Sequence, residues 1–272
     1  MYLCVFFDFY DIINSKIRLG AINMKPFERR KKLLNELYVN NIVQVSNLAE
    51  EFKVSEETIR RDLEKLEKEG IVERNYGGAK LLKSEDLPYS VRDTRNKESK
   101  IIIAKKINQF IKNDTSIFAD SSSTVIETLK RFAISDKKVH IITNAVNALY
   151  ELNQSSLEIN STGGKLLKYS SALVGPQTIE SINKFNPDYA IISCKALSKE
   201  GMITDSNEYE AHIKEIMINR AVKVILALDS SKFDKTGLIT FGQLSDIDYI
   251  VTDQDFGEDW KSILDKNSVK IL

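Results

Sequence analysis

Residues 120–124 carry side chains that suit a phosphate-binding loop: Asp120-Ser121-Ser122-Ser123-Thr124. They follow an apolar run at 115–119 and precede a helical pattern with Val125, Leu129 and Phe132 on one side. At a helix N-terminus the backbone N–H groups are free and the helix dipole favours an anion, so hydroxyl groups there can complete a phosphate site. A serine run also caps helices without binding any ligand. Both interpretations, cap and phosphate cradle, are open at this point.

A second group with chemical potential is the arginine pair in Ser-Glu-Glu-Thr-Ile-Arg-Arg-Asp-Leu, residues 55–63. Ser55 is a good N-cap, and the two glutamates after it suit the positive end of a helix dipole. The apolar residues at 59, 63 and 66 share one side of this helix, which leaves Arg60 and Arg61 on other faces. A guanidinium group can donate two parallel hydrogen bonds to a guanine edge or a phosphate. The segment therefore predicts a recognition helix that enters the major groove of DNA.

Two helical patterns precede this helix and a hairpin pattern follows it. After Gly70, two short strand patterns flank the turn Asn75-Tyr76-Gly77-Gly78, which predicts a wing. The whole is a winged helix-turn-helix at residues 24–82. The apolar positions of the first helix are Phe27, Leu33, Leu34, Leu37 and Tyr38, and those of the second are Val45, Leu48, Ala49 and Phe52.

The expected DNA contacts come from the helix-turn-helix and the wing. The alternative is a solvated amphipathic helix whose arginines have no particular role, but the succession of stripe, turn, capped arginine helix and glycine hairpin favours DNA binding. The residues expected to contact DNA are Ser46, Ser55, Thr58, Arg60, Arg61, Lys65, Arg74, Tyr76 and Gly77.

The bulk composition limits the remaining possibilities. The 272 residues are 42% hydrophobic and 29% charged, as in ordinary globular proteins, and the net charge is zero. DNA contact must therefore depend on a local arrangement of basic residues. Two cysteines form no disulfide framework or metal-ligand pattern, so we expect no metal, no cofactor and a reducing cytoplasmic location. Residues 1–23 lack a membrane span or secretory signal, and we expect Met24 to be the natural start and 1–23 a non-native extension.

The rest of the chain predicts a connector and an α/β domain. Residues 83–99 are polar and contain Pro88, which predicts a linker, and Lys100 begins a second domain that runs to residue 272. Apolar runs alternate there with helical patterns, which predicts a Rossmann-like parallel sheet with helices on both faces. The predicted strands are residues 115–119, 139–142, 157–161, 189–193, 222–228 and 249–252.

Ligands in such sheets bind beyond the carboxyl ends of the strands, where several polar residues of this chain stand. Lys195 and Lys232 can neutralise a phosphate, and Asp120 can accept sugar hydroxyls. Glu210 and Lys214 are spaced as a helical pair, which by default is a surface salt bridge. The expected effector-binding residues are Asp120, Ser121, Ser122, Ser123, Thr124, Thr143, Asn144, Gly163, Gly164, Lys195, Glu210, Lys214, Asp229 and Lys232.

From residue 24 to the C-terminus the sequence resembles the DeoR family of bacterial regulators. The resemblance is carried by Leu-Ala-Glu-Glu-Phe at 48–52, Val-Ser at 54–55, Thr-Ile-Arg-Arg-Asp-Leu at 58–63, and Arg74 with Gly-Gly-Ala at 77–79. It implies a sensor domain similar in fold to ribose-5-phosphate isomerase that responds to phosphorylated sugars. The family's sensor motifs fall on residues 120–124, 143–144, 163–164, 210 with 214, and 229 with 232. Ser122 departs from the family's usual glycine, and residues 193–196 replace a more glycine-rich stretch.

The resemblance implies a repressor of carbohydrate-metabolism genes that binds a double-stranded operator as a dimer or tetramer. One alternative is a sugar-phosphate isomerase-like enzyme with a DNA-binding appendage, although residues 193–196 lack the isomerase's acidic Asp-Gly-Ala-Asp segment. Another is a constitutive DNA-binding protein whose second domain only oligomerises. Cys194 is expected to be a buried structural residue, since a nucleophilic role would require His140 or His212 beside it.

Overall fold

Two compact units make up the chain, Met1–Ser84 and Glu85–Leu272. The computed structural model describes residues 24–68, 70–81 and 88–272, and each unit is considered by itself. The expectation that residues 1–23 are a non-native extension concerns residues outside the described part. None of the described helices combines the length and apolar character that a membrane span requires.

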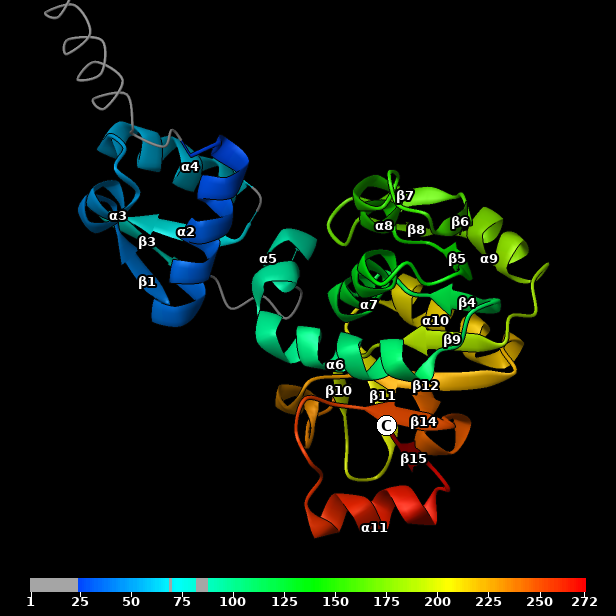
Figure 1. Cartoon of the computed structure of the whole chain (residues 1–272). Coiled ribbons are helices and arrows are strands. Elements are labelled where there is room, and N and C mark those ends of the chain that lie inside the picture. The colour runs from blue at the N-terminus through cyan, green and yellow to red at the C-terminus, as the bar shows by residue number, and fades with distance from the viewer. Residues whose placement is uncertain (1–23, 69, 82–87) are drawn as a thin grey trace, which may run out of the picture. The chain divides into compact units, whose positions relative to one another are not determined.

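The described residues of the first unit form three helices and a small antiparallel sheet of order β1-β3-β2 (Figure 1). This is the predicted winged helix-turn-helix, with α3 and α4 as the two helices of the motif and β2–β3 as the wing. Its elements are α2 Pro26–Asn40, β1 Ile42–Gln44, α3 Val45–Phe52, α4 Glu56–Lys68, β2 Val72–Asn75 and β3 Gly78–Leu81.

Apolar stripes position the helices of this unit. All four predicted positions of α3 are buried, and so are residues 59, 63 and 66 of α4. In α2 the three leucines are buried but Phe27 is 68% exposed, so its predicted place in the stripe is wrong. Phe27 lies in the first turn of α2. The Ser55 hydroxyl accepts a hydrogen bond from the Thr58 N–H at 3.2 Å, which confirms the predicted N-cap of α4.

A buried ion pair connects α2 to α4. Arg29 Nε donates to Asp62 Oδ2 at 2.5 Å, and both side chains are less than one tenth exposed. Arg30 adds a longer contact of 3.6 Å to the other oxygen of Asp62. Since a buried charge is tolerated only with a partner, these contacts determine how α4 lies against α2. Asp62 follows directly after the arginine pair, so the same contacts orient the predicted recognition helix.

The wing depends on a close backbone approach at Gly78. A Cβ atom at this position would lie 2.0 Å from the carbonyl oxygen of Val43 in β1, so only glycine fits. Gly77 has a φ of 92°, which other residues rarely adopt. Tyr76, at the same turn, is fully exposed. The two glycines therefore form the hairpin and leave Tyr76 at its tip.

The second unit is built on a seven-stranded, all-parallel sheet of order β15-β14-β12-β9-β4-β5-β6 (Figure 1). Counted in chain order, this is the doubly wound order 3-2-1-4-5-6 with one strand added at the edge. The strand order reverses between β4 and β9, which is the position where such sheets bind ligands. The strands are β4 Thr115–Ala119, β5 Val139–Thr143, β6 Glu158–Ser161, β9 Tyr189–Ile192, β12 Lys223–Ala227, β14 Tyr249–Val251 and β15 Lys270–Ile271.

Alternating side chains give the sheet two apolar faces. Ile117 and Ile191 pack on one side with helices α6 and α7, while Phe118 and Ile192 pack on the other with α9, α10 and α11. The Rossmann-like α/β prediction is confirmed, and six of the seven strands lie where the sequence predicted them. The helices are α6 Lys97–Phe110, α7 Ser123–Ile134, α8 Val146–Glu151, α9 Pro176–Ile182, α10 Glu208–Arg220 and α11 Glu258–Lys266.

Smaller elements complete this unit at the carboxyl ends of the strands. β7 and β8 form a hairpin, and β10, β11 and β13 form a second antiparallel sheet. Their bounds are β7 Lys165–Leu167, β8 Ala172–Val174, β10 Ala196–Leu197, β11 Met202–Asp205 and β13 Ile239–Gln243, with short 3-10 helices at Ser230–Lys232 and Leu244–Asp246.

The predicted linker of residues 83–99 is too long at its C-terminal end. Helix α5, Tyr89–Thr94, lies within it, and α6 begins at Lys97. Tyr89 and Val91 are buried, and the Tyr89 N–H donates to the carbonyl of Tyr169 in the second unit. This short helix was missed because two apolar residues in a polar stretch show no sustained periodicity, and only contact with the domain buries them.

We expect Asp62→Ala to destabilise the DNA-binding unit by about 3–5 kcal/mol, because it leaves the buried Arg29 guanidinium without its partner. Urea denaturation of the full chain followed by circular dichroism measures the change. Glu64→Ala, on the same helix in an exposed pair with Lys68, is the control and is expected to have little effect. Equal stability of the two variants would contradict the structural role of the Arg29–Asp62 pair.

Candidate functional site

A cavity of about 180 Å³ lies at the carboxyl ends of the central strands in the second unit. It is lined by residues at or after the ends of β9, β11 and β12, by the first residue of α7, and by residues of α5, α6 and the segment between them. Its position matches the ligand site of doubly wound sheets. The lining residues are Arg92, Arg95, Asn96, Lys100, Ser123, Tyr169, Cys194, Lys195, Asp205, Ser206, Lys214, Asp229, Ser231, Lys232 and Lys235.

The lining is strongly cationic. It contains seven lysine or arginine residues and two aspartates, although the whole chain has no net charge. Positive groups that converge on a concave site attract an anion and raise its local concentration. The lining also contains hydroxyl, amide and carboxylate groups, which can form hydrogen bonds with the hydroxyls of a polyol. The cavity is therefore suited to a small, hydroxylated anion.

Lys214 in α10 is at the centre of a buried charge network. Its Nζ donates to Asp205 Oδ2 and lies 3.5 Å from Asp120 Oδ2. Burial alone lowers the pKa of Lys214, but Asp205, Asp120 and Glu210 outweigh it and raise this pKa above its usual value. Burial likewise raises the pKa of Asp205, but Lys214 reverses the effect and lowers it. Lys214 and Asp205 are thus held as an ion pair.

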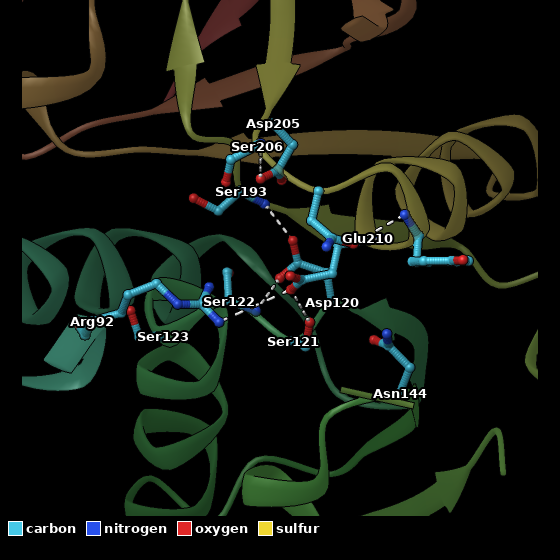
Figure 2. A network of polar contacts seen from close by, with 12 residues as sticks. Arg92, Asp120, Ser121, Ser122, Ser123, Asn144, Ser193, Asp205, Ser206 and Glu210 are labelled. Carbon is cyan, nitrogen blue, oxygen red and sulfur yellow. Dashed lines mark hydrogen bonds and ion pairs between the residues drawn. The ribbon is translucent and has the colours of Figure 1, made fainter. Parts of the chain in front are cut away.

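The prediction that Glu210 and Lys214 form a surface pair by default is replaced by two buried roles. Both side chains are at most 6% exposed. Asn207 caps α10 by accepting hydrogen bonds from two N–H groups, which fixes the first turn that carries Glu210. Glu210 Oε1 accepts the Ser121 hydroxyl at 3.1 Å and lies 4.0 Å from Nη2 of Arg92. Figure 2 shows Arg92 pointing toward this group of polar residues.

In the loop after β4, residues 121–124, one hydroxyl side chain caps a helix and another lines the cavity. Ser122 Oγ accepts the N–H of Val125 at 3.2 Å and is the N-cap of α7, so the capping interpretation holds for this residue. Ser121 is bound to Glu210, and Thr124 is buried in α7. Ser123 lines the cavity, and its hydroxyl donates to the carbonyl of Arg92 at 3.1 Å.

Asp120 connects this loop to the neighbouring strand. Its Oδ1 accepts the N–H of Ser122, and its Oδ2 accepts the N–H of Ser193 beyond β9, each at 2.9 Å (Figure 2). Asp120 is 1% exposed and does not line the cavity. It therefore shapes the switch point of the sheet, where the sequence predicted contact with sugar hydroxyls.

The loop after β12 supplies a second group of polar side chains. Asp229 Oδ1 accepts from Asn96 Nδ2 at 2.9 Å and also from Ser231. Burial raises the pKa of Asp229, but Lys232 and these hydrogen bonds outweigh it and lower the pKa below its usual value. Lys232 Nζ donates to Ser193 Oγ at 3.0 Å. The loops after β9 and β12 are thus joined across the cavity.

Lys100 is the most perturbed cation of the lining. Its Nζ donates to the carbonyls of Arg92 and Arg95, and the side chain is almost fully buried. Burial lowers the pKa of Lys100 to about 7; the Lys232 charge contributes to the lowering, and Asp229 opposes it. Near neutral pH this residue therefore changes its charge, and an anion in the cavity would favour its charged form.

Several predicted effector residues lie outside this lining. Thr143 Oγ1 donates to the carbonyl of Ala119 at 2.7 Å, which joins two strand ends. Asn144 Nδ2 donates to the carbonyl of Leu173. A Cβ atom on Gly164 would lie 2.1 Å from the Thr178 hydroxyl, so Gly164 allows close packing of the chain, while a Cβ atom on Gly163 would meet nothing within 4 Å. Ser123, Lys195, Lys214, Asp229 and Lys232 are the predicted residues that do line the cavity.

The sequence did not single out ten of the lining residues for effector binding. Four of them belong to the segment assigned to the linker or to the first residue after it, and the basic spacing at 92, 95 and 100 is the only signal that could have drawn attention to them. The others stand in loops, at the end of a strand or in a 3-10 turn, and only the tertiary structure brings them to the cavity. The missed residues are Arg92, Arg95, Asn96, Lys100, Tyr169, Cys194, Asp205, Ser206, Ser231 and Lys235.

Cys194 is buried, and burial raises the pKa of its thiol to about 12. A thiol with this pKa stays protonated at neutral pH and is a poor nucleophile. His140 in β5 lies 3.1 Å from Glu158 of β6, and His212 lies 3.3 Å from Glu215 within α10. These contacts favour the structural interpretation of Cys194.

In the first unit, the predicted DNA-contacting residues lie at the surface. Arg60 and Arg61 are 48% and 74% exposed, and each forms an exposed ion pair with a glutamate one turn earlier, Glu56 or Glu57. Such pairs are weak in water and can yield to phosphate or base contacts. Thr58 is partly buried, and the other predicted residues, Ser46, Ser55, Lys65, Arg74, Tyr76 and Gly77, are exposed.

A winged helix-turn-helix joined to an α/β unit with a cationic cavity is the architecture of a ligand-responsive transcriptional regulator. Comparison with known families agrees: the DeoR-like helix-turn-helix domain matches residues 29–85 and the DeoR C-terminal sensor domain matches residues 95–254. The chain belongs to the DeoR family of transcriptional regulators.

Curated relatives match nearly the whole chain. The uncharacterized HTH-type transcriptional regulator YulB of Bacillus subtilis is 35% identical over 90% of this chain and 92% of its own length. The HTH-type transcriptional regulator GlpR of Haloferax volcanii is 30% identical over 92% and 98%. The glycerol-3-phosphate regulon repressor of Escherichia coli is 28% identical over 85% and 92%.

Solved structures resemble only part of the chain. Ribose 5-phosphate isomerase A from Neisseria gonorrhoeae matches with a TM-score of 0.39 and 15% identity, over 52% of this chain and 54% of that one. A likeness of this extent carries no conclusion about activity.

Lys100 makes a testable contribution to the pH dependence of stability. Because its folded pKa of about 7 lies below the unfolded value of about 10.4, the unfolded state binds more protons between these limits. The stability of the natural protein relative to Lys100→Met should rise by about 1.4 kcal/mol per pH unit above pH 7 and be constant below it. Urea denaturation at pH 6, 7, 8 and 9 measures this difference.

The matched control is Lys199→Met, which removes an exposed lysine of the same unit. It should leave the pH dependence of the natural protein unchanged. Parallel pH profiles for Lys100→Met and the natural protein would show that Lys100 titrates normally.

Proposed function

We propose that this protein is a DNA-binding repressor of carbohydrate-metabolism genes whose second unit binds a phosphorylated sugar. The observation that carries the proposal is the cationic cavity at the switch point of the sheet, with seven basic lining residues beside hydroxyl and carboxylate groups. A phosphate group requires the cations, and sugar hydroxyls require the polar groups. Binding of the sugar phosphate alters the affinity of the first unit for its operator.

The names of the relatives support both parts of this proposal. One is a glycerol-3-phosphate regulon repressor and another an L-fucose operon activator, both of Escherichia coli. Three of these relatives are named repressors and two are named activators, so we propose repression for this chain.

Regulation without catalysis is the second part of the proposal. The buried cysteine of the cavity is protonated, and Lys214 and Asp205 neutralise each other in an ion pair. Neither the thiol nor this ion pair is therefore poised to transfer a proton at neutral pH. Lys100 does titrate near pH 7, but its amine donates to the carbonyls of Arg92 and Arg95. The isomerase-like alternative predicts turnover of ribose 5-phosphate, and we expect none.

We further propose that the protein acts in the cytoplasm as a homo-oligomer, in which two helix-turn-helix units bind two half-sites. Two linked contacts bind far more tightly than one, so a change in their spacing is an effective switch. The alternative of a constitutive DNA-binding protein, whose second unit serves only for oligomerisation, predicts operator binding that no ligand changes.

We expect Arg60→Ala to weaken operator binding by about 10- to 100-fold, because it removes a bidentate donor from the recognition helix. A gel-shift titration on the protein's own promoter at fixed salt measures this. Lys68→Ala removes one exposed cation from the far end of the same helix and is the control, with a much smaller effect expected. Equal losses in the two variants would indicate non-specific charge attraction instead of a recognition helix.

Sensing is tested by a thermal-shift and gel-shift screen with hexose phosphates, ribose 5-phosphate and glycerol 3-phosphate. A ligand that binds only the folded state raises its melting temperature, and the effector among them should also change operator affinity. Lys232→Ala should bind this ligand at least about tenfold more weakly and keep its operator affinity, since one charge-assisted hydrogen bond is removed. Lys199→Ala serves as the control. Indifference of the natural protein to every phosphorylated sugar would refute the sensing proposal.

A further inference from the structure

Arg92 differs from the other cations of the cavity in its hydrogen bonding. Its Nε and Nη2 atoms are buried and have no hydrogen-bond partner in the described part of the chain. The nearest carboxylate oxygen, Glu210 Oε1, lies 4.0 Å from Nη2, which is too far for a hydrogen bond. In contrast, Lys100, Lys214 and Lys232 all donate to oxygen atoms of the protein.

Unpaired donors on a buried guanidinium cost free energy, and an anionic acceptor recovers it. The Arg92 side chain lines the cavity and is about one quarter exposed, but these two nitrogens are shielded from solvent. An anion in the cavity therefore reaches them only if the side chain turns toward it. A planar guanidinium that does so can form two parallel hydrogen bonds to a phosphate.

The backbone of Arg92 is also held by the cavity. Its carbonyl accepts hydrogen bonds from Lys100 Nζ and from the Ser123 hydroxyl, and both donors are lining residues. These hydrogen bonds link the backbone of Arg92 to Ser123 at the N-terminus of α7 and to Lys100 in α6.

Arg92 lies on α5, the first helix of the second unit. Only seven residues separate Tyr89, where α5 begins, from Leu81, the last residue of the wing strand β3. The covalent path from the cavity to the DNA-binding unit therefore begins at α5, whose position depends on its contacts within the second unit.

We propose that Arg92 binds the anionic group of the effector and that α5 thereby couples occupancy of the cavity to the DNA-binding unit. This inference rests on the proposed function and adds the residue and the helix through which the effector acts. The ligand class is a phosphate monoester: the paired donors of a guanidinium match two oxygens of one phosphate, and the seven basic lining residues suit a group that carries nearly two negative charges.

Binding is measured by calorimetry on the full chain, with inorganic phosphate and the sugar phosphates of the screen as probes. Arg92→Gln should weaken binding of the sugar phosphate at least about tenfold, and Arg92→Lys should lose less because it keeps the charge. Arg131→Gln is the matched control: Arg131 also has an unpartnered buried Nε but lies outside the cavity lining. Arg131→Gln should bind the sugar phosphate like the natural protein.

Coupling is measured separately, as the ratio of operator affinities without the sugar phosphate and at concentrations that saturate each variant. If α5 transmits the signal through Arg92, Arg92→Lys should show a ratio closer to one than the natural protein even at saturation. A residue that only adds affinity would leave this ratio unchanged once the site is full.

Three results would overturn the inference, and they are distinguishable. If Arg92→Gln binds the sugar phosphate as tightly as the natural protein does, Arg92 is not the anion-binding residue, and the proposed function stands. If saturated Arg92→Lys gives the full ratio, α5 is not the coupling element. If the natural protein binds no probe at all, the proposed function fails and this inference fails with it.

Discussion

The cavity depends on how Asp120 is held at the end of the first strand of the parallel sheet. One carboxylate oxygen binds the N–H of Ser122 and the other binds the N–H of Ser193, so the loops after β4 and β9 are joined at the point where the strand order reverses. The same carboxylate lies 3.5 Å from Lys214. A carboxylate that is 1% exposed is tolerated only with such partners, and they in turn determine where the two loops lie.

Charge compensation around Lys214 satisfies the charged groups on one side of the cavity. Asp205 and Asp120 neutralise this lysine, and its pKa is raised while that of Asp205 is lowered, so both stay charged. The opposite side differs, because Lys100 has a pKa of about 7 and Arg92 lacks hydrogen-bond acceptors for two of its nitrogens. The two cations that the protein itself stabilises least, Arg92 and Lys100, thus lie on α5 and α6, near the start of the second unit.

The DNA-binding unit separates structural from recognition roles along a single helix. In α4, Asp62 faces inward to Arg29, while Arg60 and Arg61 face solvent and are held only by weak pairs with neighbouring glutamates. Asp62 therefore orients the helix, and the arginines remain available for a duplex. In the wing, Gly78 serves close packing against β1, whereas Tyr76 at the tip is fully exposed.

Elements with strong local signals could be predicted from the residues alone. Ser55 and Ser122 are N-caps with local partners, the stripes of α3 and α4 repeat every three to four residues, and six of seven parallel strands are apolar runs. Family motifs added the resemblance that the comparisons confirmed. These features depend on residues close together in the chain, so periodicity and capping reveal them.

The tertiary structure alone decided which polar residues share a cavity. Helix α5 has too few apolar residues to show a period, and it is fixed by burial of Tyr89 and Val91 against the second unit. Arg92, Asp205 and Lys235 come together from segments far apart in the chain, so no local pattern could join them. The surface salt bridge expected of Glu210 and Lys214 became a buried network for the same reason: their partners Ser121 and Asp205 lie on other elements.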